Sequence, residues 1–166
     1  MGELLGFKAI WPDSDEEGKA QPDGVWILGD RLAITFEVKS EKGEAGTLYV
    51  HDIRQAQSHP SWLKQYCKLP PSAKILNVVI STTMTIDKDA VRMSEGIKFV
   101  NIREVQRLAD RAVSVMTRVR NAMGENQAPE QLITTILSEV EKSSAGVHSI
   151  LKILENNGVD ALTIKK

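Results

Sequence analysis

The sequence predicts an α/β protein with a mixed β-sheet flanked by helices and a helical hairpin at the C-terminal end. Two observations lead to this prediction. Short runs rich in β-branched and aromatic residues occupy residues 7–39 and recur at 75–81 and 97–100. Long apolar stripes with helical spacing begin only at Ile102. Strands in the first part and helices in the last part indicate a sheet that the helices cover.

The composition is that of an ordinary globular protein. The chain has 166 residues and a formal charge of −1, with 42% hydrophobic and 26% charged residues, which excludes a disordered chain. The apolar runs are far shorter than the roughly 18–20 residues of a membrane span. No secretory signal is visible, and the single cysteine, Cys67, excludes an intrachain disulfide. We therefore expect a cytoplasmic protein without a membrane partner.

The first part of the chain predicts three successive strands. The tripeptide Gly29-Asp30-Arg31 separates the second and third strands, which is typical of a β-hairpin. The expected elements are a helical turn at Leu4, strands over Phe7–Trp11, Val25–Leu28 and Leu32–Lys39, and a polar loop over Pro12–Pro22.

The middle of the chain predicts one helix and two more strands. A helix is expected from about Leu48 to Ser58, where Pro60 interrupts it. The run Ile75–Ser81 is continuously apolar, as in a strand that is buried on both faces. A shorter strand is expected over Ile97–Val100.

The last part predicts three helices. One amphipathic helix spans Ile102–Ala122 and ends at Gly124, and Pro129 suits the first turn of the next helix. Two apolar stripes follow, one of Leu132, Ile133, Ile136, Leu137 and Val140, the other of Val147, Ile150, Leu151 and Leu154 before Asn157-Gly158. We therefore divide the chain into a core of residues 1–123 and a helical extension of residues 124–166. The stripes need a partner, either the core itself or a second chain in a homodimer or larger complex.

Charged side chains at the end of the third strand form the most informative pattern. Glu37 and Lys39 are two residues apart on this strand and point to the same face, whereas Val38 points to the other. A carboxylate and an ammonium on an otherwise apolar strand are costly unless they are paired or used. The pattern therefore marks a candidate functional site.

The register of the hairpin decides whether Asp23 joins this site. A two-residue turn would place Asp23 opposite Phe36 and on the wrong face. A three-residue loop pairs Leu28 with Leu32 and places Asp23 opposite Glu37. We predict the three-residue register, or a bulge equivalent to it.

Two facing carboxylates favour a divalent cation. In the predicted register the β-carbons of Asp23 and Glu37 are roughly 5 Å apart, and like charges at this distance are unfavourable unless a cation joins them. Hard oxygen ligands suit Mg²⁺, and the backbone carbonyl of Val38 is a candidate third ligand. Lys39 would orient and help deprotonate a metal-bound water next to a phosphate. This combination predicts hydrolysis of phosphodiesters.

The residues Pro22-Asp23 and Glu37-Val38-Lys39, on successive strands before a helix, resemble the motif of the PD-(D/E)xK nuclease superfamily. The order of elements over residues 3–122 is similar to its restriction-endonuclease-like core. The resemblance implies that Asp23 and Glu37 bind Mg²⁺ or Mn²⁺, that Lys39 serves the attacking water, and that the chain is an endonuclease acting on DNA.

Further residues follow from the same resemblance. Many members carry a glutamine on the next helix, which matches Gln55, and an acidic residue on the first helix, for which Glu3 is the candidate. Some members have a tyrosine four residues after the glutamine, where this chain has His59. The resemblance implies that Gln55 orients the site.

Two other functions stay open on the sequence alone. In the first, the chain keeps a nuclease fold without activity and binds nucleic acid or protein, with Glu37 and Lys39 as solvent-facing residues of an edge strand. In the second, it is an assembly module that dimerises through its terminal helices.

Three further sets of side chains are expected to be structural. A basic stripe on one helix face is expected to be solvated, the histidines to lie at the surface, and the tryptophans to pack in or near the core rather than stack on bases. These sets are Arg103, Arg107, Arg111 and Arg118, then His51, His59 and His148, then Trp11, Trp26 and Trp62.

Overall fold

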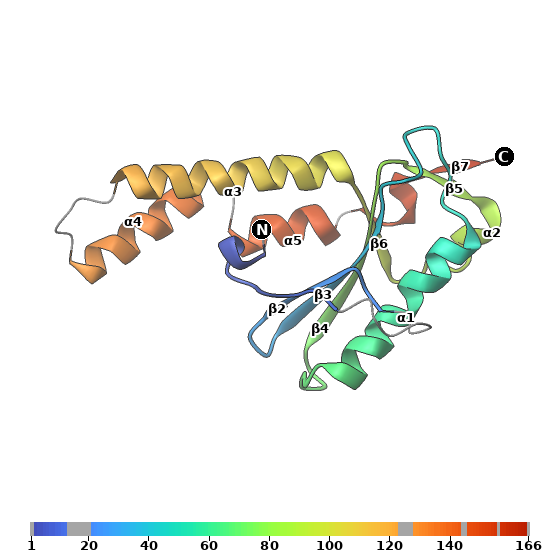
Figure 1. Cartoon of the computed structure of the whole chain (residues 1–166), viewed down its shortest axis with the longest axis horizontal. Coiled ribbons are helices and arrows are strands. Elements are labelled where there is room, and N and C mark those ends of the chain that lie inside the picture. Colours follow the sequence, from blue (N-terminus) through green and yellow to red (C-terminus); the bar gives the residue numbers. More distant parts are fainter. Residues whose placement is uncertain (1, 13–20, 123–127, 144–145, 156, 166) are drawn as a thin grey trace.

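A computed structural model describes residues 2–12, 21–122, 128–143, 146–155 and 157–165. In these residues a mixed sheet of five strands has the order β1-β2-β3-β4-β6, with helices on both faces (Figure 1). The predicted mixed α/β fold with C-terminal helices is therefore confirmed. None of the helices in these ranges is long and apolar enough to cross a bilayer.

The five strands of the sheet are those that the sequence predicts. β1, β2 and β3 are antiparallel, whereas β3, β4 and β6 are parallel. Their bounds are Lys8–Ile10, Gly24–Leu28, Leu32–Lys39, Lys74–Ser81 and Ile97–Asn101. Leu28 pairs with Leu32, so the predicted three-residue loop is confirmed. Gly29 starts this loop at φ 51°, a left-handed conformation that favours glycine.

The first long helix, α1 (Val50–Tyr66), runs through Pro60, so the expected interruption there is wrong. Proline lacks the N–H that would bond to the carbonyl four residues earlier. That carbonyl belongs to Ala56 and instead accepts a hydrogen bond from Nδ2 of Asn77 at 2.7 Å. The side chain from β4 thus replaces the missing helical bond.

Several short elements are not predicted by the sequence. A second sheet pairs β5 (Thr85–Asp87) with β7 (Thr163–Lys165) in parallel, next to α2 (Lys88–Val91). The described residues also contain two 3₁₀ turns. Glu3–Leu5 includes Leu4 and agrees with the helical turn expected there, whereas Val159–Ala161 is not predicted. Segments of three or four residues are too short for a periodic pattern.

The two faces of the main sheet carry different cores. α1 covers one face, and α3 (Ile102–Ala122) and α5 (Val147–Glu155) cover the other (Figure 1). Ile34 and Phe36 of β3 pack toward α3 and α5, where they share one core cluster with Ile150 of α5. The end of the chain therefore contributes to the main core.

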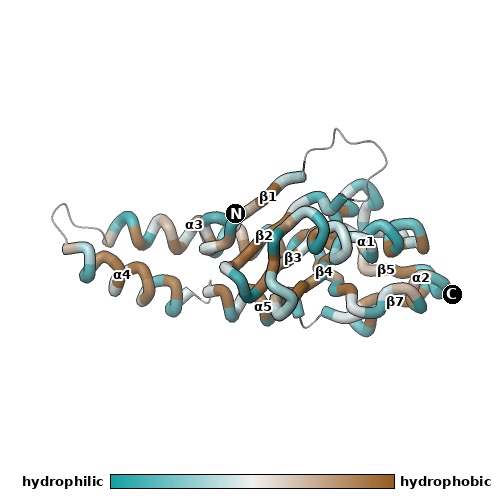
Figure 2. The backbone as a smooth tube through the Cα atoms, turned by 90° about the horizontal axis from the view of Figure 1, so that it is seen from below, coloured by the Kyte–Doolittle hydropathy of each residue, from teal (hydrophilic) through white to brown (hydrophobic). Residues whose placement is uncertain are grey.

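The C-terminal helices do not form the expected hairpin with each other. α4 (Pro129–Lys142) lies along α3 and away from the sheet, as both views show (Figures 1 and 2). Ile136 and Val140 of its stripe pack on α3, whereas Ile133 and Leu137 stay exposed. The predicted boundary between residues 123 and 124, with the helix end at Gly124, lies outside the described residues.

The place of α5 in the core can be tested with Ile150→Ala. Ile150 is fully buried, so we expect a loss of about 2–5 kcal/mol in the free energy of unfolding, measured by urea denaturation. The control is Leu137→Ala on the exposed face of α4, which should change it by less than about 0.5 kcal/mol. Equal losses in the two variants would show that α5 is not part of the core.

Candidate functional site

The face of β3 that packs on α1 becomes polar toward the end of the strand. Thr35, Glu37 and Lys39 alternate with apolar residues and all point to this face. Thr35 is fully buried and donates a hydrogen bond to Oδ1 of Asn77 at 3.0 Å. The expectation of a solvent-facing edge does not hold for Glu37, which is 1% exposed on a central strand.

Lys39 joins two other predicted site residues. Its Nζ lies 2.6 Å from Oε1 of Glu37 and donates a hydrogen bond to Oε1 of Gln55 at 2.9 Å. Gln55 reaches this point from α1, the helix that covers this face. The structure therefore brings Glu37, Lys39 and Gln55 together, as the sequence predicts.

The charge of Lys39 is set by opposing effects. Burial lowers the pKa of Lys39, but its hydrogen bond to Glu37 and the negative charges of Glu37, Asp52 and Glu41 raise it more. The resulting pKa lies above the usual 10.5. Lys39 is therefore an ammonium ion at neutral pH.

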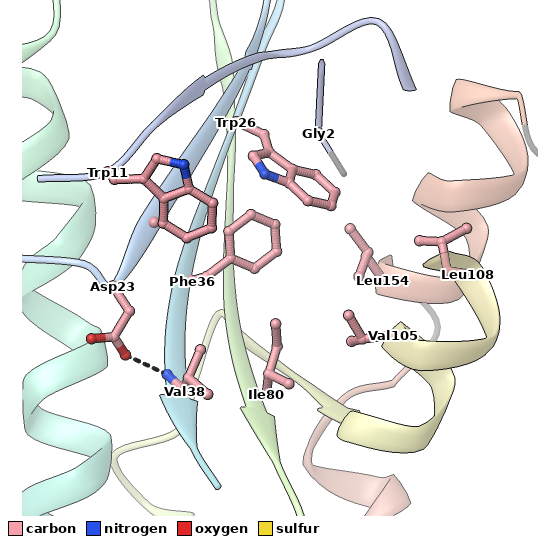
Figure 3. Close-up of a pocket in the computed structure, with 11 residues that line it drawn as sticks. Gly2, Trp11, Asp23, Trp26, Phe36, Val38, Ile80, Val105, Leu108 and Leu154 are labelled. Atoms are coloured by element: carbon pink, nitrogen blue, oxygen red, sulfur yellow. Dashed lines mark hydrogen bonds between the residues drawn. The ribbon is translucent and has the colours of Figure 1, made fainter. Parts of the chain in front are cut away.

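Asp23 lies just before β2, at the same end of the hairpin as Glu37. Gly24 pairs with Phe36, so Asp23 and Glu37 are the next residues beyond the ladder. The N–H of Asp23 bonds to the Phe36 carbonyl at 2.8 Å, and its Oδ2 accepts a hydrogen bond from the N–H of Val38 at 2.6 Å (Figure 3). The side chain thus closes the end of the hairpin.

The pKa of Asp23 is raised above the usual 3.8. Burial is the main cause, and the charge of Glu37 adds to it. The hydrogen bond from Val38 and the charge of Lys39 lower the pKa by less. Asp23 and Glu37 are therefore close enough to repel each other, as the predicted register requires.

The carbonyl of Val38 faces the Asp23 side of β3. Its N–H points there to bond with Asp23, and the N–H and C=O of one strand residue point the same way. Glu3 is exposed on the first 3₁₀ turn, and among the described residues it makes no hydrogen bond or ion pair with Asp23, Glu37 or Lys39. The structure does not bring Glu3 into the site.

His59 is a site residue that the sequence analysis misses. It is 0% exposed, so its expected surface position is wrong, whereas His51 is exposed as expected. Its Nε2 lies 3.1 Å from Oε2 of Glu37, but the two atoms do not have hydrogen-bond geometry. The contact is therefore a close polar one, not a formed hydrogen bond. His59 lies one helical turn after Gln55, a spacing that places both on one face of α1.

Asp52 is a second site residue that the sequence analysis misses. Its buried carboxylate accepts a hydrogen bond from the N–H of Tyr49 at 2.8 Å and pairs with Nζ of Lys42 at 2.9 Å. Oδ1 lies 4.0 Å from Nζ of Lys39. Its place in the first turn of a helix is typical of a capping residue, so sequence alone gives it a structural explanation.

The groups near Glu37 offer only a few oxygen ligands for a hard cation. In the described part of the chain, no three His, Cys, Asp or Glu side chains are arranged to hold a metal ion. Two carboxylates and a carbonyl are left as ligands, a set that suits Mg²⁺ because this ion retains several waters. Oε2 of Glu37 is buried and has no hydrogen-bond partner within the described structure, but it lies 3.1 Å from Nε2 of His59, so an ion that binds this oxygen has to share it with His59.

No protein-family model, curated protein or solved structure matches the chain. Function is therefore inferred from the residues of this site.

The raised pKa of Asp23 predicts that the variant Asp23→Asn gains free energy of unfolding relative to the wild type as the pH rises. Folded Asp23 holds its proton to a higher pH than the unfolded chain, so its contribution to stability falls as the pH rises above about 3.8. Asparagine does not titrate and still accepts from Val38. The unfolding free energy of Asp23→Asn minus that of the wild type should therefore increase from about pH 4 to about pH 7.

Urea denaturation at the two pH values measures this difference. Asp30→Asn in the exposed hairpin loop is the matched control and should show no such increase. A decrease for Asp23→Asn would contradict the raised pKa.

The contact of His59 with Glu37 predicts coupling between the two residues. His59→Phe keeps a buried ring but removes the polar neighbour of Oε2 of Glu37, so we expect a loss of about 1 kcal/mol in the free energy of unfolding, the size of an ordinary single-site change. The loss should be smaller in a Glu37→Gln background. His51→Phe is the exposed control. The same loss in both backgrounds would show that His59 acts through packing alone.

Proposed function

We propose that the chain is a metal-dependent endonuclease that hydrolyses DNA phosphodiesters. The observation that carries this proposal is that Glu37, Lys39 and Gln55 contact one another at the end of β3, with Asp23 near enough for the charge of Glu37 to raise its pKa. A carboxylate that is 1% exposed is held there against a lysine whose side chain is 13% exposed. Buried charges of this kind cluster at functional sites.

Each residue has a role in this proposal. Asp23, Glu37 and the carbonyl of Val38 would hold Mg²⁺ or Mn²⁺. When bound, such an ion lowers the pKa of water and neutralises phosphate charge. After burial, the charge of Glu37 also raises the pKa of Asp23, as expected for two carboxylates placed near each other.

In this proposal Lys39 orients the nucleophile and stabilises the negative charge of the transition state. Its raised pKa keeps the ammonium protonated, so it donates hydrogen bonds and does not remove a proton. Gln55 accepts one of these hydrogen bonds and thereby fixes the ammonium at the end of β3. A fixed donor stabilises charge in the transition state without reorganisation.

A second function, a nuclease fold that binds nucleic acid or protein without activity, also has an observation in its favour. Oδ2 of Asp23 and Oε1 of Glu37 are already satisfied by protein groups, the N–H of Val38 and Nζ of Lys39. A purely structural ion pair would show the same contacts. The two functions differ in whether DNA is cleaved when the metal is present.

The endonuclease proposal predicts loss of cleavage in Lys39→Ala. Incubation of supercoiled DNA with the wild type and Mg²⁺ or Mn²⁺ should give nicked and linear products, and EDTA should abolish them. Lys39→Ala should reduce the rate by about 100-fold or more, because it removes a fixed charge beside the reacting phosphate. Lys74→Ala, at an exposed ion pair with Glu155, is the matched control and should cleave as the wild type does.

Two outcomes would contradict this proposal. One is the absence of cleavage with either metal by a folded wild-type chain, which favours the binding module. The other is equal cleavage by the wild type and Lys39→Ala, which assigns the products to a contaminating nuclease.

A further inference from the structure

An apolar cavity of about 150 Å³ lies next to Asp23, on the side of β3 opposite to Lys39 (Figure 3). Its walls are mostly aromatic and aliphatic, and among the described residues that line it Asp23 is the one acidic residue. The residues that the inference uses are Trp11, Asp23, Trp26, Phe36, Val38 and Leu108.

Packing of the core does not explain the position of Trp11, which forms one wall of the cavity. Trp11 is 72% exposed, so its expected place in or near the core is wrong, whereas Trp26 is buried as expected. Its ring lies over Gly24, where an added β-carbon would come within 3.2 Å of it. An exposed indole thus lies against the start of β2, and both Trp11 and Asp23 line the cavity.

The inner walls are rings in a fixed arrangement. Trp26 and Phe36 form an edge-to-face pair with centroids 4.7 Å apart and planes at 67°. Both belong to the core cluster under α3 and α5. The cavity is therefore a hollow between one exposed ring and two fixed rings, a shape and chemistry that suit a planar aromatic ligand.

We propose that this cavity takes the base of a nucleotide next to the cleaved phosphate, so that the substrate is DNA that is single-stranded or unpaired at the cleavage site. This proposal rests on the proposed nuclease function. Asp23 borders the cavity and also belongs to the candidate metal site, so a phosphate at that site would have its neighbouring base beside Trp11. Bases inside a duplex are stacked and paired and do not reach such a cavity without being extruded.

The surroundings favour a nucleotide over an uncharged aromatic molecule. Leu108 borders the cavity and also a second hollow that is lined by Arg107 and Arg111. Both arginines are exposed, and Glu104 is the acidic residue beside them. Cations next to an aromatic hollow are typical of single-strand binding, where bases stack on rings and the backbone follows positive charge.

The test is equilibrium binding of the whole chain in EDTA, where no cleavage takes place. Fluorescently labelled DNA of one sequence is offered as a single strand and as a duplex. Trp11→Ala should weaken binding of the single strand by about 5- to 100-fold, the usual range for loss of one stacking ring, with little effect on the duplex. Trp11→Phe should restore most of the affinity. Trp62→Ala on α1 is the matched control and should bind as the wild type does.

Three results would overturn the proposal that the cavity binds a base. They are no binding of the single strand by the wild type, unchanged binding by Trp11→Ala, or an equal loss for the single strand and the duplex. A failure of the nuclease function is seen separately, as an absence of cleavage with Mg²⁺ or Mn²⁺. If cleavage does occur, replacing the nucleotide at the cut site by an abasic one should slow it in the wild type but not further in Trp11→Ala; equal slowing in both would also overturn the proposal.

Discussion

The contact between Glu37 and Lys39 is the constraint on which this region of the structure depends. An ionised carboxylate that is almost fully buried costs several kcal/mol unless charge and hydrogen bonds compensate it. Lys39 supplies the charge from the same strand, because residues two apart share a face. Gln55 holds the ammonium from α1, and His59 lies against the other oxygen. The packing of α1 on β3 therefore depends on polar contacts as well as on apolar ones.

This dependence also explains why α1 must continue past Pro60. His59 reaches Glu37 only if the helix is intact at this point, yet Pro60 removes one of its hydrogen bonds. Asn77 compensates by donating to the freed carbonyl of Ala56 and accepting from Thr35. Thr35, Asn77 and the carbonyl of Ala56 thus form one hydrogen-bonded chain between β3, β4 and α1, and removal of Asn77 would leave the other two without these partners.

The sequence is sufficient to predict what depends on local pattern. The alternation in β3 and the length of the Gly29-Asp30-Arg31 loop together fix the hairpin, and the hairpin places Asp23 near Glu37. The sequence pattern is not sufficient where residues far apart in the sequence determine the local structure. Pro60 is a helix breaker by local rules, and only Asn77 on another element changes the outcome. In the same way, the burial of His59 depends on the strand beneath it, and the exposure of Trp11 depends on its placement over Gly24.

The two faces of β3 differ in chemistry at the end of the strand, and the proposed function uses both. Because successive side chains alternate, Glu37 and Lys39 point to the polar layer under α1, whereas Phe36 and Val38 point to the apolar cavity. Asp23 lies at the edge between them, since it borders the cavity, accepts a hydrogen bond from the N–H of Val38 and is near enough to Glu37 and Lys39 for their charges to act on its pKa. A nucleotide has the same division, with a charged phosphate and an apolar ring a few bonds apart. One strand end that offers charge on one face and aromatic surface on the other is the physical basis for proposing an unpaired nucleotide as the ligand, since a paired duplex would leave the aromatic face without a ligand.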